Sequence, residues 1–244
     1  MLGLKIHSLP KLANPNMIAA LPDMGNVAGL GMGFLVKKLN AKLFAEIYAF
    51  WPPGISYDNG LAKYDQSSYK FHYCEKENLV LFSGEFNPSD PRRLYELCYE
   101  VVDMGKKLGV GTLYSIGAAL RQPSPTDPKL FAVATTSKLV SEIKEQGIDL
   151  LNGKGQITGF NGLILGIAME KELDSICILG EIDNPNIIQP RAAQAILTKL
   201  LQILNLKPLD MKELEEEEDR KKFMQQQANY MSGLSHKDNQ PGIA

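Results

Sequence analysis

Two glutamates stand where a pair of carboxylates could perform acid–base chemistry. Glu85 ends the run LVLFSGE, and Glu181 ends the run ICILGE. Such apolar runs indicate buried strands, and open α/β sheets bind their ligands beyond the carboxyl ends of the strands. One carboxylate there could act as general acid and the other as general base. The alternative is that each carboxylate accepts backbone N–H groups of a neighbouring turn. We favour this alternative, because the sequence places no nucleophile or cation beside either glutamate.

A cluster of glycines follows the first expected strand of the body, in the segment PDMGNVAGLGMG. Its members are Gly25, Gly29, Gly31 and Gly33. Backbone N–H groups at the start of a helix can hold a phosphate. The spacing departs from the dinucleotide fingerprint because Phe34 replaces the last glycine, and the chain has no Gly-Lys-Ser/Thr tripeptide. We therefore expect these glycines to permit close packing. Gly25 and Asn26, together with the two glutamates, are the candidate residues of a pocket.

The metal-ligating residue types are scattered along the chain. His7, His72 and His236 lie far apart, and only His72 and Cys74 share the spacing of one strand face. Two ligands do not make a metal site. The sequence also lacks the short motifs of serine hydrolases, zinc proteases and protein kinases. We expect neither a metal nor a cofactor.

The composition excludes several classes of protein. The 244 residues include 26 basic and 28 acidic side chains, so a net charge of −2 gives no general attraction to nucleic acid or anionic membrane. No apolar run approaches the ~20 residues that cross a membrane. Three widely spaced cysteines indicate free thiols rather than a disulfide framework. We expect a cytoplasmic protein.

Strand-like and helix-like segments alternate along the chain, a pattern that predicts an α/β fold. We expect strands at 17–21, 42–50, 69–74, 79–82, 110–116, 130–135 and 175–181. We expect helices at 27–39, 90–108, 137–147, 163–173, 190–204 and 210–231, with Asp90 or Ser89 capping the second and Ser137 the third. The chain then divides into an α/β body at 1–206, a charged C-terminal helix at 207–234 and a flexible tail at 235–244.

The expected last helix carries six acidic residues in the seven positions from Glu213 to Asp219. Each of three acids there has a base four residues later, an arrangement that stabilises an exposed helix by about 0.2–0.5 kcal/mol per pair. The pairs are Glu216 with Arg220, Glu217 with Lys221 and Glu218 with Lys222. We expect the helix either to project from the body or to pack lightly against a neighbour. The candidate partner-binding residues are Trp51, Phe223, Tyr230, Met231, Leu234 and Ile243.

Four segments together resemble the proteasome assembly chaperone family. They are ALPDMGNVAGLGMGFLVKKLNAKLFAEIYAFWPP, NLVLFSGEFNP, GQITGFNGLILGIAMEKELDSICILGEI and PRAAQAILTKLLQILNL with the acidic helix after it. The resemblance implies a three-layer α/β/α sandwich similar to nucleoside phosphorylases, homo-oligomeric assembly and ATP-independent binding to proteasome α subunits. Relatives that dock by their C-termini end in a hydrophobic residue, tyrosine and any residue, whereas Ile243 occupies the tyrosine position here. Gln189-Pro190 likewise replaces the Asp-Pro that opens the last body helix of many relatives.

Two functions follow as expectations. The first is a non-enzymatic protein that assembles with itself and binds protein partners, either proteasome α subunits or other proteins. The second is a small-molecule enzyme of hydrolase, phosphorylase-like or ligase type that uses Glu85 and Glu181. A structure separates them, because the enzyme requires both carboxylates to converge on one pocket.

Overall fold

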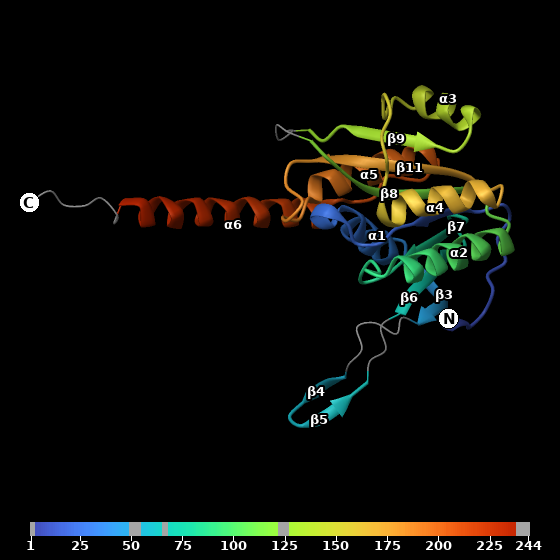
Figure 1. Ribbon diagram of the computed structural model, residues 1–244, viewed down its shortest axis with the longest axis horizontal. Coiled ribbons are helices and arrows are strands. Elements are labelled where there is room, and N and C mark those ends of the chain that lie inside the picture. The colour runs from blue at the N-terminus through green and yellow to red at the C-terminus, as the bar shows by residue number, and fades with distance from the viewer. Residues whose placement is uncertain (1–2, 49–54, 65–67, 122–126, 238–244) are drawn as a thin grey trace, which may run out of the picture.

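A computed structural model describes residues 3–48, 55–64, 68–121 and 127–237, with side chains as far as residue 227 (Figure 1). One nine-stranded mixed sheet forms the centre of the body, in the order β1-β3-β6-β7-β2-β8-β11-β9-β10. Its strands are β1 (Gly3–Ile6), β2 (Asn16–Ala19), β3 (Lys42–Tyr48), β6 (Ser68–Cys74), β7 (Leu79–Ser83), β8 (Thr112–Leu120), β9 (Leu130–Ala134), β10 (Asp149–Leu150) and β11 (Asp174–Ile182).

The middle of the sheet is parallel because its strands are joined by helices that cross over it. Strands β7, β2, β8 and β11 run in one direction, with Asn16 level with Leu79 on one side and Thr112 on the other. Their sequences are apolar almost throughout, as both faces are buried. The antiparallel hairpin strands β3 and β6 extend one side, and β9 extends the other. The carboxyl ends of the four central strands therefore share one edge.

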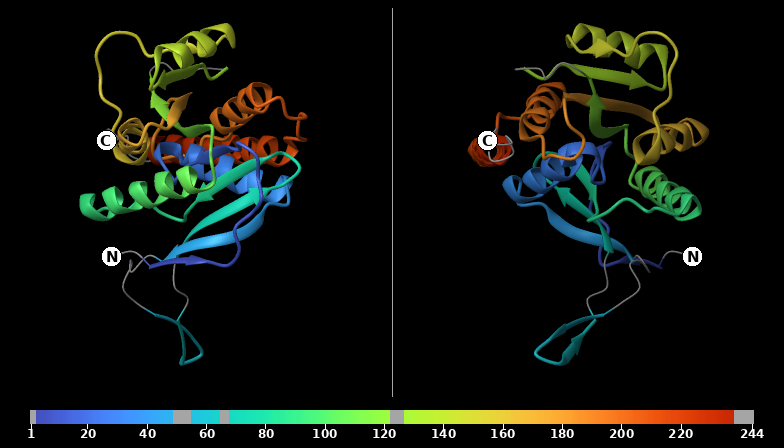
Figure 2. Two further views of the ribbon diagram at one scale, coloured as in Figure 1. Left: turned by 90° about the vertical axis from the view of Figure 1, so that its right-hand side faces the viewer. Right: turned by 60° about the vertical axis from the view of Figure 1, so that its left-hand side comes forward.

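Helices cover both faces of this sheet (Figure 2). The helices are α1 (Val27–Lys38), α2 (Pro91–Lys107), α3 (Ser137–Glu145), α4 (Gly159–Glu170), α5 (Pro190–Ile203) and α6 (Lys212–Lys237), with a short 3-10 turn, η1 (Met24–Asn26), before α1. Helices α2 and α4 pack together on one face, α1 and α5 pack together on the other, and α3 lies against β9 and β10. One hydrophobic core fills each side, so the expected three-layer α/β/α body with a C-terminal helix is confirmed.

A small hairpin stands apart from these layers. Strands β4 (Ser56–Asp58) and β5 (Leu61–Lys63) form a separate two-stranded antiparallel sheet. The hairpin extends away from the body, from the part of the chain between β3 and β6 (Figures 1 and 2).

The structure contains every strand and helix that the sequence pattern predicted, and it adds four short strands. The additions are β1, β4, β5 and β10. Asp90 caps α2 as expected, since its side chain accepts a hydrogen bond from the Arg92 N–H at 2.9 Å. The expected cap at Ser137 is wrong, because Thr136 accepts the Leu139 N–H and Ser137 is the first helical residue. No helix among the described residues is long and apolar enough to span a membrane.

Candidate functional site

The structure does not bring Glu85 and Glu181 together. Glu85 is exposed two residues after β7, whereas Glu181 is buried in β11. Strands β2 and β8 lie between them, so three strand spacings of ~4.8 Å place their backbones about 14 Å apart. Glu181 accepts the Lys129 N–H at 3.2 Å and lies 3.6 Å from the Arg121 guanidinium. It fastens the chain before β9 to β11, which is the structural role that we favoured.

Gly25 joins two strand-end loops, and Asn26 follows it in the same turn. The Gly25 N–H donates to the Pro185 carbonyl at 2.8 Å, and its own carbonyl accepts the Gln189 N–H at 2.8 Å. These bonds tie the loop after β2 to the loop after β11. Both Gly25 and Asn26 have left-handed backbones, with φ of 63° and 51°. The sequence marked this turn correctly, but its partner loop was not predictable from local pattern.

Asp23, just before this turn, is a residue that sequence reasoning missed. Its Oδ1 accepts the Ala28 N–H at 2.9 Å, so it caps the first turn of α1. Its Oδ2 is buried and has no hydrogen-bond partner among the described residues. Burial disfavours the charged carboxylate and raises the pKa of Asp23 to about 6. Its signal in the sequence was its place four residues before Val27, where the helical period begins.

We expect Asp23→Asn to remove one component of the pH dependence of stability. The folded state holds the Asp23 proton more tightly than the unfolded chain, whose aspartate titrates near 3.8. The stabilisation is therefore complete below about pH 4 and disappears as the pH rises through 6. Between pH 5 and pH 8 the wild type should lose about 1.5 kcal/mol more than the variant. Urea unfolding at both pH values measures this, and parallel losses in the two proteins would contradict it.

The glycines of α1 have different surroundings. A Cβ added at Gly31 would lie 3.2 Å from Ile116 Cδ1, so close packing of the helix against β8 is confirmed at this position. Gly29 and Gly33 instead line a cavity of about 190 Å³, with Lys70 and Glu85 also in its wall. The described residues hold no group of three or more metal-ligating side chains.

The first half of α6 is firmly docked on the body. Leu214 is buried, and Glu213 bonds to Lys37 of α1 at 2.8 Å. Glu215 accepts a hydrogen bond from Gln194 of α5 at 3.2 Å. The acidic run therefore supplies contacts to two helices of the body. Only the second half of the helix projects, a division that the charge pattern did not predict.

A buried polar cluster fixes the end of the docked half. The Lys221 ammonium donates to Gln189 Oε1 at 2.9 Å and lies 3.6 Å from Glu218, which also faces Arg191 at 3.6 Å. Gln189 in turn donates to Asp183 and to the Asn184 carbonyl. Lys221 and Glu218 are almost inaccessible to solvent. The cluster links α6 to the loop after β11, whose Pro185 and Gln189 form the hydrogen bonds to Gly25.

The three ion pairs expected along α6 are not the pairs that form. Spacings of three residues replace the expected spacings of four. The observed pairs are Glu217 with Arg220, Glu218 with Lys221 and Asp219 with Lys222. For the expected pair of Glu217 with Lys221 the physical reason is that Lys221 turns toward Gln189 in the body, away from Glu217.

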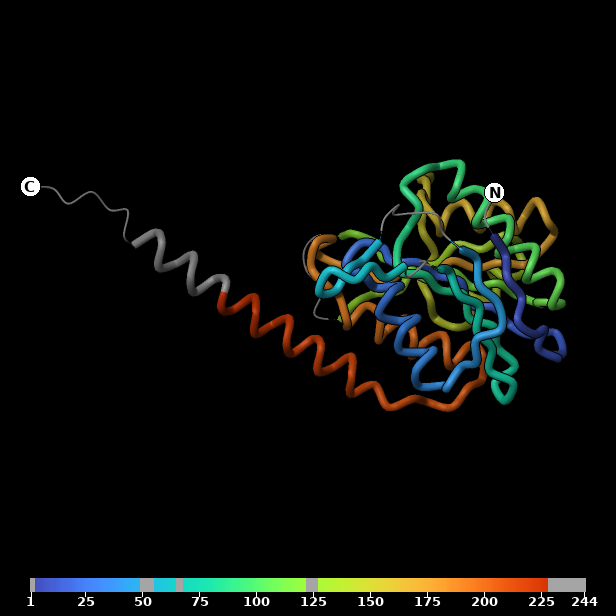
Figure 3. The backbone as a smooth tube through the Cα atoms, turned by 90° about the horizontal axis from the view of Figure 1, so that it is seen from below, coloured from blue at the N-terminus to red at the C-terminus, as the bar shows by residue number. Residues whose placement is uncertain are grey.

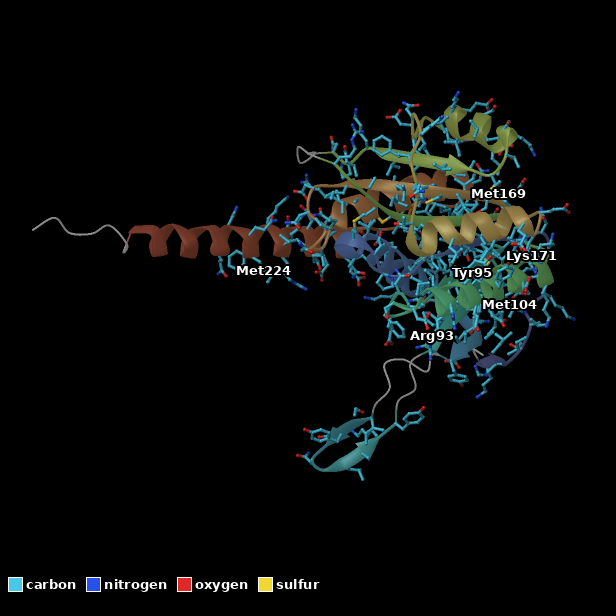
Figure 4. The ribbon with its side chains drawn as sticks, in the orientation of Figure 1. Arg93, Tyr95, Met104, Met169, Lys171 and Met224 are labelled. Carbon is cyan, nitrogen blue, oxygen red and sulfur yellow. The ribbon has the colours of Figure 1, made fainter. Side chains whose placement is uncertain are left out.

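Beyond Lys222 the helix leaves the body (Figures 1 and 3). Phe223 and Met224 are mostly exposed, and Figure 4 shows Met224 on the projecting half. The backbone of α6 continues through Tyr230, Met231 and Leu234. Their side chains lie outside the described residues, as do Trp51 and Ile243.

The family model described as PAC2 family matches residues 17–228 of this chain. The chain belongs to the PAC2 family. The match includes the body and most of α6, and the resemblance noted from the sequence is confirmed. This PAC2 protein is 28% identical, over 91% of its length, to the uncharacterized protein MJ1210 of Methanocaldococcus jannaschii, of which 84% is covered.

Solved structures share the fold of this PAC2 protein. The Pyrococcus furiosus protein PbaB, described as an archaeal proteasome activator, superposes with a TM-score of 0.83 at 23% identity, covering 93% of this chain and 98% of that one. PbaA of the same organism, described as an archaeal homolog of proteasome-assembly chaperone, has a TM-score of 0.78 at 22% identity, covering 96% and 95%. At these identities the likeness shows that the fold is shared.

Proposed function

We propose that this PAC2 protein is a cytoplasmic, non-enzymatic chaperone-like protein that assembles with itself and binds protein partners without a cofactor or ATP. Proteasome α subunits are the first candidates for the partner, since two neighbours of the same fold are described as a proteasome activator and a homolog of a proteasome-assembly chaperone. The three cysteines are free and buried, which suits a reducing compartment. Nucleic acid and membrane have no place in this proposal.

The division of α6 carries the proposal. The first half of this helix packs on the body, and its second half is exposed. The exposed half therefore offers a surface that makes no contribution to the packing of the body. Phe223 and Met224 give this surface apolar contact area beside the polar, uncharged run of Gln225, Gln226 and Gln227. Met is adaptable and aromatic side chains dominate interface energetics, so both residues suit protein recognition. We call residues 223–244 the arm.

The arm makes a direct test possible. A truncation after Lys222 keeps Leu214, Glu218 and Lys221 and so retains the docked half of α6. We expect its melting temperature to stay within about 2 °C of the full chain, because the removed Phe223 and Met224 are exposed. Mass photometry or pulldown with the proteasome α subunits of the same source should show a complex with the full chain and at least a tenfold loss of affinity with the truncation.

The outcomes separate the components of the proposal. No complex with the full chain would overturn the proteasome assignment. Equal complexes with both chains would place the contact on the body and exclude the arm. A double variant Phe223→Ser, Met224→Ser in the full chain provides a control for length, and we expect it to lose most of the affinity that the truncation loses.

The enzyme hypothesis receives no support from the geometry. Glu85 follows β7 and Glu181 lies in β11, three positions away in the sheet, and Glu181 is engaged by the Lys129 N–H and Arg121. Acid–base catalysis needs both groups within reach of one substrate.

A further inference from the structure

The β4–β5 hairpin has two chemically different faces. Side chains alternate along each strand, and the pairing of Tyr57 with Ala62 places these two residues on the same face. Ile55 and Tyr64 continue this face at the base of the hairpin. The opposite face carries Ser56, Asp58, Leu61 and Lys63. We call the first of these, formed by Ile55, Tyr57, Ala62 and Tyr64, the aromatic face.

The hairpin is locally well specified but has no core of its own. Asn59 and Gly60 both have positive φ, at 49° and 81°, as the two-residue turn that matches strand twist requires. Lys63 bonds to Asp58 at 3.0 Å across the polar face. Isolated two-stranded hairpins are at best marginally stable in water. The aromatic face nevertheless remains uncovered, with Tyr57 79%, Tyr64 68% and Ile55 62% exposed.

We propose that the aromatic face of the β4–β5 hairpin docks on a second copy of this chain and is the surface through which the protein self-associates. The inference rests on the self-association included in the proposed function and names the surface that performs it. The charge of the hairpin favours no ionic partner, because its two charged residues, Asp58 and Lys63, pair with each other. A hairpin that recognised an acidic protein or an anionic membrane would carry unpaired basic side chains.

The exposed area decides between a second copy and a different protein. Tyrosine side chains bury 150–250 Å² each, so the aromatic face offers about 400 Å² in total. Docked once on an unrelated protein, it would bury about 800 Å² over both partners, which is the size of a crystal-packing contact. If each of two copies docks its hairpin on the other, their interface contains two such contacts. Their contact buries about 1,600 Å², the usual size of a specific interface.

The test uses three variants of the full chain and the wild type. Tyr57→Ser with Tyr64→Ser removes the aromatic face, and Tyr57→Phe with Tyr64→Phe keeps it. Leu61→Ser is the matched control, since Leu61 is 69% exposed on the polar face of the same hairpin. We expect the serine variant to raise the dissociation constant of self-association at least tenfold in mass photometry and light scattering. The phenylalanine variant and Leu61→Ser should change it less than twofold.

The outcomes also separate this inference from the proposed function. A wild-type chain that is monomeric at tens of micromolar would overturn both the self-association and the hairpin's role in it. An assembly that the serine variant leaves unchanged would overturn the hairpin proposal alone. Binding to proteasome α subunits, measured with the same proteins, reports on the arm of α6 independently.

Discussion

Lys221→Met should release the docked half of α6 from the body. The substitution leaves Gln189 Oε1 without its donor and removes one of the two cations beside the buried Glu218 carboxylate. Buried groups deprived of a partner typically cost 1–3 kcal/mol each, so we expect docking to weaken by about 3 kcal/mol. Amide hydrogens at 214–222 should then exchange about 100-fold faster, as measured by native-state hydrogen exchange.

Two further variants make this result specific. Lys222→Met is the matched control, because Lys222 is half exposed and faces Asp219 at 3.9 Å in solvent. It should change exchange less than threefold, since exposed ion pairs contribute little. Glu218→Leu combined with Lys221→Met should recover part of the loss, because no buried carboxylate then remains. If the Lys221→Met variant kept the wild-type rates of amide exchange, Leu214 and the exposed contacts of Glu213 and Glu215 would suffice to hold the helix on the body.

Gly25→Ala should destabilise the body by about 3 kcal/mol and lower its melting temperature by about 10 °C. An alanine at φ of 63° is strained, and its Cβ would lie 2.5 Å from Gln189 Cγ and 3.2 Å from the Ile187 carbonyl. Gln189 cannot move aside cheaply, because three hydrogen bonds hold its side chain to Asp183, Asn184 and Lys221. Differential scanning calorimetry measures the change.

Gly33→Ala is the natural control for this substitution. Gly33 lies in α1, and a Cβ added there has no neighbour within 4 Å. Alanine in a helix interior is favoured over glycine, so this variant should gain about 0.5–1 kcal/mol. A loss of equal size in both variants would show that the strand-end junction is not what constrains Gly25.

The elements of the body were predictable because local pattern determines them. The runs around Ile18, Leu81 and Ile178 are apolar as buried parallel strands must be, and α2 has one apolar stripe with a cap at Asp90. The short strand β1 was missed because its four residues show no clear alternation of buried and exposed side chains. It forms through pairing with β3, which is distant in the sequence. The hairpin was missed for a similar reason, although Asn59-Gly60 carried its turn signal.

The candidate site was less predictable, because long-range contacts build it. Nothing near Lys221 in the sequence shows that Gln189, 32 residues earlier, will accept a hydrogen bond from its ammonium group. The charges of α6 therefore resembled a solvated helix, while Glu213, Glu215, Glu218 and Lys221 contact the body. Glu85 and Glu181 are each close to where the strand pattern placed them. Only the order of the strands, which the sequence leaves open, separates them.

The docked start of α6 sets the direction and the reach of its free end. From Phe223 to Lys237 a continuous helix extends about 22 Å, at 1.5 Å per residue. A rigid rod anchored at Lys221 confines its tip to a small volume, whereas a loose tether of equal length would spread it over a large one. The local concentration of the tip at a partner's surface is correspondingly higher. In an assembly of several copies, each rod would arrive at a defined angle, so two or more could engage one partner at once.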